Sequence, residues 1–171
     1  MKNLGRTYAA AAALMIAALG VAPPASAHRF RDALRQMANE ASVEQNGRGN
    51  GAATAQNGAA NGSAIEQNGD DHTATVRQNG DANDAAIRQF GRNNTGAITQ
   101  NGSGNDACLL QIGRNVNGEI VQNGDNQSTG VLQTKRGSLL IPVELCQSYD
   151  RHHAVGLIRH VALRSILGAR R

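Results

Sequence analysis

The chain has 171 residues, a formal net charge of +4, no Trp, two Phe and two Tyr. This composition excludes a conventional globular core, because large aromatic side chains dominate the packing of such cores. The small net charge does not indicate nucleic-acid binding.

Residues 1–27 have the features of a secretory signal peptide. Lys2 and Arg6 form a positive start, an apolar stretch follows, and Ala25-Ser26-Ala27 makes a small-residue cleavage site. A membrane anchor is the alternative, but the apolar stretch is short and Pro23-Pro24 ends it. We therefore expect export from a bacterial cytoplasm and a mature chain that starts at His28.

Residues 28–41 form a leader in which both charge signs occur, for example at Arg29 and Asp32. Its composition is compatible with a helix. A solvated linker is favoured over a targeting tag.

Residues 42–134 repeat with a period of 11 residues. Gln recurs nine times at this spacing without a slip: Gln45, Gln56, Gln67, Gln78, Gln89, Gln100, Gln111, Gln122 and Gln133. Globular domains do not keep a polar residue at a constant spacing over so many cycles, whereas an array of identical structural units does. The spacing predicts a stacked, quasi-one-dimensional protein.

Other positions of the unit are nearly constant. Gly stands two residues after Gln at Gly47, Gly58, Gly69, Gly80, Gly91, Gly102, Gly113 and Gly124. Asn stands five residues after Gln at Asn50, Asn61, Asn83, Asn94 and Asn105, while His72, Val116 and Gln127 interrupt that position. An aliphatic side chain stands nine residues after Gln at Ile65, Val76, Ile87, Ile98, Leu109, Ile120 and Val131, and a small residue precedes it by two.

The parity of these positions predicts one strand and one turn per unit. The small residue, the aliphatic residue and the next Gln are two apart, so a strand points all three to one side. The Asn-Gly-x-x-Asn half has turn chemistry, because Gly adopts positive φ freely and Asn tolerates it.

Three other structures are compatible with parts of this pattern. A right-handed coiled coil also has an 11-residue period, but repeated Gly would cost a helix about 1 kcal/mol each. An antiparallel meander with Asn-Gly hairpin turns would place Gly and Asn inside strands. A disordered Asn- and Gln-rich tract is the third, and the strict aliphatic phase argues against it.

We therefore predict an all-β fold, a β-solenoid with cross-β stacking whose 22-residue coils each contain two strand-turn units. Five glutamines stack on one sheet and four on the facing sheet. Their side-chain amides form hydrogen-bonded ladders at the strand repeat of about 4.8 Å. The aliphatic residues form a thin dry core between the sheets.

Residues 135–171 form a basic tail in which the repeat stops. Lys135 stands where the next unit should have Gly, and Asp150 is a candidate N-cap for a short helix toward Gly168. Contact with anionic membrane, a cap over the last coil, a tail unrelated to the fold, and a frameshifted C-terminus are all open.

No catalytic, cofactor or metal site is predicted. His152, His153 and His160 lack the companion ligands of a metal site. An exported chain permits a disulfide between Cys108 and Cys146, and two reduced thiols are equally compatible with the sequence. A disulfide would pin the tail to the array.

The array resembles the curlin repeat of bacterial curli fibres. Gln78-Asn79-Gly80, Asn83, Ala85, Ile87 and Gln89 match that repeat position by position, and so does the unit from Gln100 to Gln111. The resemblance implies a secreted functional amyloid of the biofilm matrix that forms adhesive, pilus-like fibres at the cell surface. It implies partners too, namely further copies of the chain, other curlin subunits, and the outer-membrane curli secretion channel with its accessory factors.

The chain also departs from that family. Asn replaces the Ser that marks half of the family's units, and the leader lacks the usual Gly- and Asn-rich address for the channel. A soluble, capped β-solenoid that binds ice or glycan is the alternative function. Such proteins present a regular outward face, whereas the outward positions here are irregular.

Overall fold

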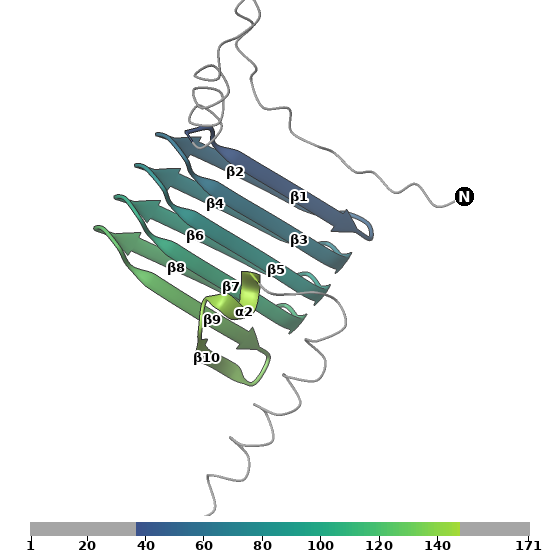
Figure 1. Cartoon of the computed structure of the whole chain (residues 1–171). Helices are drawn as coiled ribbons and strands as arrows, with labels where there is room; N and C mark the ends of the chain where they lie inside the picture. Colours follow the sequence, from purple (N-terminus) through teal and green to yellow (C-terminus); the bar gives the residue numbers. More distant parts are fainter. Residues whose placement is uncertain (1–36, 148–171) are drawn as a thin grey trace, which may run out of the picture.

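The computed structural model describes residues 37–147, which form a stack of flattened coils (Figure 1). Successive strands of the array alternate between two sheets. The six-stranded sheet contains β1 (Glu40–Asn46), β3 (Gly62–Asp70), β5 (Asp84–Arg92), β7 (Asp106–Arg114), β9 (Ser128–Thr134) and β10 (Gly137–Ile141). The four-stranded sheet contains β2 (Gly51–Asn57), β4 (Thr73–Asn79), β6 (Thr95–Asn101) and β8 (Asn117–Asn123).

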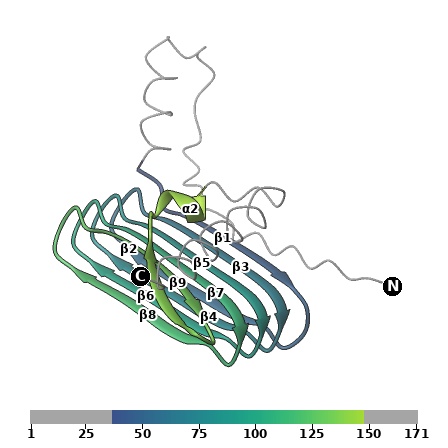
Figure 2. The same cartoon turned by 90° about the horizontal axis from the view of Figure 1, so that it is seen from below.

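The predicted β-solenoid is confirmed. Every pair of neighbouring array strands is parallel, and each residue lies beside the residue 22 positions further on, as Gln67 does beside Gln89. The antiparallel meander is therefore wrong for the array. Figure 2 shows the coils nested one behind another, with the two sheets facing each other across a narrow interior.

The interior holds one aliphatic side chain from each array strand except β2, where Thr54 occupies that position. Ile65, Val76, Ile87, Ile98, Leu109 and Ile120 are buried, with Val43 and Val131 partly buried at the two ends of the row. Small residues such as Ala74 and Ala85 complete this core and let the sheets approach. Each buried aliphatic side chain contributes about 1.5–3 kcal/mol, so the core is stable only as the sum of its coils.

The turns explain the repeated Gly. Gly80 has φ +127°, and a Cβ there would lie 2.0 Å from the carbonyl oxygen of Gly102 in the next coil. The position four residues after Gln also has positive φ throughout the turns, for example at Ala60, Asp71 and Asn93. Gly, Asn or Asp occupies six of the eight such positions, because these residues tolerate the left-handed region.

The segment after the array folds back on it. Lys135 and Arg136 form a tight turn, and β10 then pairs antiparallel with β9. A short helix, α2 (Glu144–Gln147), follows and contacts β5 and β7 (Figures 1 and 2). Within residues 37–147, no helix is long and apolar enough to cross a bilayer.

Several expectations concern residues that the structure does not describe. The signal peptide at 1–27, residues 28–36 of the leader and the helix expected from Asp150 lie outside the described residues. Strand β1 begins at Glu40, so the last two residues of the expected leader belong to the first strand.

Candidate functional site: the amide ladders

Two rows of Gln side chains run along the inside of the solenoid. The Nε2 of each Gln from Gln45 to Gln111 donates to the Oε1 of the Gln one coil further toward the C-terminus, at 2.7 to 2.9 Å. Gln45, Gln67, Gln89, Gln111 and Gln133 form the row on the six-stranded sheet, and Gln56, Gln78, Gln100 and Gln122 form the other. Each row is a continuous chain of hydrogen bonds with one direction.

The same amides tie the two sheets together. The Nε2 of Gln89 lies 2.9 Å from the carbonyl oxygen of Thr73, at the start of a strand in the opposite sheet, and 3.2 Å from that of Asn94 in the adjoining turn. Gln78 makes the equivalent contacts with Gly62 and Asn83. Among the described residues, no buried side-chain nitrogen or oxygen lacks a partner. This complete pairing is what makes a buried row of amides tolerable in a thin core.

A second ladder runs along the turns. The Nδ2 of Asn61 donates to the carbonyl oxygen of Gly80, and its Oδ1 accepts the backbone N–H of Asn83 in the next coil. Asn50, Asn83, Asn94 and Asn105 make the same pair of contacts. The predicted Gly positions thus supply the carbonyl oxygens that the predicted Asn positions bind.

One member of this ladder, Asn39, was not predicted from the sequence. Asn39 donates to the carbonyl oxygen of Gly58 and accepts the backbone N–H of Asn61. It lies 11 residues before Asn50, so extending the period upstream would have found it.

His72 replaces Asn in the ladder rather than interrupting it. The ring is fully buried, and its Nδ1 accepts the backbone N–H of Asn94 at 3.2 Å, as an Asn Oδ1 would. The backbone N–H of His72 in turn donates to the Oδ1 of Asn50. At the two other interruptions, Val116 and Gln127 keep the backbone donation to the preceding Asn.

We expect His72→Ala to lower the free energy of unfolding by about 1–3 kcal/mol, because it leaves the buried N–H of Asn94 without an acceptor. His72→Asn is the matched control and restores the acceptor, so its stability should equal or exceed that of wild type. Urea unfolding followed by circular dichroism measures both changes. Equal destabilisation by the two variants would contradict the ladder role of His72.

The two ends of the Gln rows differ chemically. At the N-terminal end, no described residue donates to the Oε1 of Gln45 or Gln56. At the C-terminal end, the Nε2 of Gln122 donates to the hydroxyl of Thr129 instead of a further Gln, while Gln133 accepts from Gln111. The solenoid therefore has an acceptor end and a donor end.

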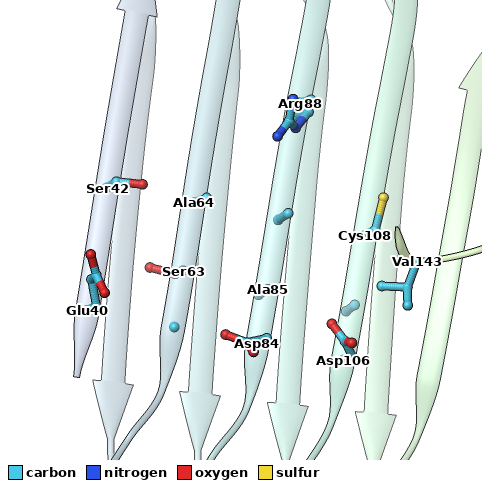
Figure 3. A pocket seen from close by; sticks show the side chains of 13 residues that line it. Glu40, Ser42, Ser63, Ala64, Asp84, Ala85, Arg88, Asp106, Cys108 and Val143 are labelled. Atoms are coloured by element: carbon cyan, nitrogen blue, oxygen red, sulfur yellow. The ribbon is translucent and has the colours of Figure 1, made fainter. Parts of the chain in front are cut away.

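The outer face of the six-stranded sheet has both charged and apolar parts. Arg88 lies 3.3 Å from Glu66 on the neighbouring strand. Figure 3 shows Glu40, Asp84 and Asp106 in one row along a shallow groove, with Val143 beside Cys108. Cys108 is buried and disulfide-bonded, and Cys146, the other cysteine of the chain, lies in α2.

Residues 37–147 contain no cluster of three or more His, Cys, Asp or Glu residues placed to hold a metal ion.

One comparison with known proteins gives a match. Residues 50–80 and 80–113 match the curlin associated repeat, in two adjacent copies. The resemblance expected from the Gln, Gly and Asn positions is confirmed over that part of the array. No curated protein and no solved structure matches the chain.

Proposed function

Because the chain carries curlin associated repeats, we propose that it is a secreted structural subunit of curli-type amyloid fibres. The single observation that supports this most is the unbroken, one-directional Gln ladder, which starts at the N-terminal end of the described residues, where β1 and β2 are the edge strands of their sheets. Growth by stacking continues the contacts that already join one coil to the next. The chemistry of the site is association, not catalysis.

The energetics favour such growth. Docking one further coil forms on the order of ten backbone hydrogen bonds at about 1 kcal/mol each. Amide ladders and apolar burial add to this gain, against an association cost of roughly 4–15 kcal/mol. Parallel strand edges that soluble proteins normally cover are thus the assembly surface of this chain.

Each class of repeat residue has a proposed role in the fibre. The ladder residues at the Gln and Asn positions bind coil to coil, within and between subunits. The Gly residues permit the turn and the close approach of its backbone to the next coil. The aliphatic row supplies apolar burial at each new contact.

The partners follow from this role. They are further copies of the chain and other curlin subunits, in an extracellular fibre at the bacterial surface that contributes to biofilm and adhesion. The outer-membrane curli channel and its accessory factors are the proposed export route. Anionic membrane is a proposed contact of the basic residues beyond the array.

Purified chain starting at His28, refolded from denaturant at high concentration, is expected to form fibres that bind thioflavin T. Fibre diffraction is expected to give the cross-β reflections near about 4.8 Å and about 10 Å. Protein that stays folded and monomeric would contradict the proposal and favour the soluble, capped solenoid.

One observation favours that second function in part. Strand β10 covers the C-terminal edge of the six-stranded sheet, as a cap would. The outward face of the array still lacks the regular row of equal side chains that ice or glycan binding requires, since Glu40, Gly62, Asp84 and Asp106 follow one another in one row.

A further inference from the structure

We propose that residues 135–147 and a second copy of the chain compete for the same edge, the free side of β9. The docked segment closes the C-terminal end to fibre growth, and it must leave before the β1 strand of another copy pairs there. This inference rests on the proposed function and adds a control step to it.

Strand β10 blocks the edge of β9. It occupies the place beside β9 where the next coil of an array would lie, but it runs antiparallel. Ser138 of β10 lies opposite Gln133, so no amide continues the ladder there. A further parallel coil cannot add to β9 while β10 is in place.

The outer face of the array has apolar side chains where this segment lies. Cys108 and Leu110 of β7 are buried together with Val143 of the segment, and Leu132 and Ile141 pack against them. The position that Leu110 occupies on β7 is occupied by Arg88 on β5 and by Glu66 on β3. In this row, the apolar residues Leu110 and Leu132 therefore lie where the segment packs. The disulfide at Cys108 adds a covalent tie.

Gly130 is required by the docked segment and not by the stacking of the array. The residues that align with it on the other strands of the sheet all carry a side chain: Ser42, Ala64, Ala86 and Cys108. A parallel neighbour therefore does not require Gly at this position. A Cβ on Gly130 would lie 2.2 Å from the carbonyl oxygen of Ile141, so it is the passage of the docked segment that requires Gly.

Without the docked segment, the C-terminal edge is complementary to the N-terminal end of another copy. The N-terminal end presents the acceptor oxygens of Gln45 and Gln56, and the C-terminal end presents the amide donor of Gln133. Two N-terminal ends would bring acceptors against acceptors, so the chemistry favours the N-terminal end of one copy on the C-terminal end of another.

The strand count makes β9 the decisive edge. The array supplies five strands to one sheet and four to the other. A copy placed in register on β9 leaves one strand position empty beyond β8. Most backbone hydrogen bonds of the new contact then form at β9, and covering this one strand suppresses docking.

The test is Gly130→Val in the full chain from His28. The new side chain meets the backbone of Ile141 and displaces the segment, while it faces away from the Gln ladder. Ser128→Val is the matched control, because Ser128 is exposed on the same side of the same strand. Cys146→Ser is a second variant that removes the covalent tie without changing the array.

Fibre growth is followed by thioflavin fluorescence, and folding by circular dichroism. In the open form, residues 135–147 have left β9. If fibre growth requires this form, the growth rate scales with the fraction of molecules that are open. We therefore expect Gly130→Val to shorten the lag roughly tenfold or more. Cys146→Ser should shorten it less, and Ser128→Val should match wild type. Fibres of all variants should give the same diffraction.

The remaining outcomes separate the two proposals. If wild type, Gly130→Val and Cys146→Ser form fibres at equal rates, the segment does not control growth and this inference fails, while the proposed function stands. If none of them forms fibres although each is folded, the proposed function itself fails. Slower growth of both variants would show that the segment assists assembly and would also overturn the inference.

Discussion

Replacing Gln89 with Ala is expected to lower the free energy of unfolding by about 3–5 kcal/mol and to slow fibre growth strongly. Gln89 is fully buried in the middle of the array. Its loss removes the acceptor of Gln67, the donor to Gln111, and the contacts with the carbonyl oxygens of Thr73 and Asn94. Several buried polar groups lose their partner in one step, and a cavity is left between the sheets.

Arg88→Ala is the control for this change. Arg88 is the residue before Gln89, points outward and pairs with Glu66 on the outer face, where the two side chains are 15% and 22% exposed. Its truncation removes an ion pair on the outer face but leaves every ladder hydrogen bond in place, so this variant should lose less stability and assemble faster than Gln89→Ala. Urea unfolding and thioflavin kinetics measure both variants. Equal effects at positions 88 and 89 would refute the assignment of inward and outward faces.

Gly80→Ala is expected to have an effect of similar size, a loss of at least about 3 kcal/mol, for a different reason. The residue has φ +127°, and its new Cβ would meet the carbonyl oxygen of Gly102 in the next coil at 2.0 Å. The turn must deform, and its contacts with the neighbouring coils deform with it. The midpoint of urea unfolding should fall accordingly.

Gly51→Ala is the control that shows whether the loss of stability at position 80 comes from the packing of that turn against the next coil. No atom lies within 4 Å of a Cβ at Gly51, and its φ is not in the left-handed region. Replacing a Gly with Ala at such a place stabilises by about 0.4–1 kcal/mol through the unfolded chain. A loss at Gly51 as large as that at Gly80 would show that stacking of the turns is not the cause.

The fold of the array followed from the sequence because one unit specifies all of it. The phase of Ile87 and Gln89 fixed the inward face, and the 11-residue period fixed the register of 22 between parallel strands. The pairing of Glu66 with Arg88 followed from the same register. The regular spacing of the ladder hydrogen bonds leaves little for tertiary context to change.

Two features of the site were present in the sequence but were not recognised. Asn39 lies in phase with the other Asn positions. The left-handed position four residues after Gln is mostly Gly, Asn or Asp, which is the composition such a backbone needs. Asn39 is found only if the repeat is extended upstream. The left-handed position is found only if every position of the turn is compared between units, including those that vary.

Strand β10 and the role of His72 were not predictable from the period. Residues 137–141 carry no 11-residue signature, and their place is determined by pairing with β9 and by the outward Leu110 and Leu132. In the sequence, His72 interrupts the row of Asn positions. The structure shows that its Nδ1 accepts the backbone N–H of Asn94, as an Asn Oδ1 would. Such features depend on three-dimensional neighbours that a repeat pattern does not encode.

The most direct test of stacking is the identity of the residues that meet between copies in the fibre. Solid-state NMR on fibres mixed from differently labelled chains can measure contacts between side-chain amides of different copies. We predict an intermolecular contact between Gln133 of one copy and Gln45 of the next, at about 4.8 Å, the spacing of neighbouring strands. Contacts between equal residues, such as Gln89 with Gln89 of the next copy, would contradict it.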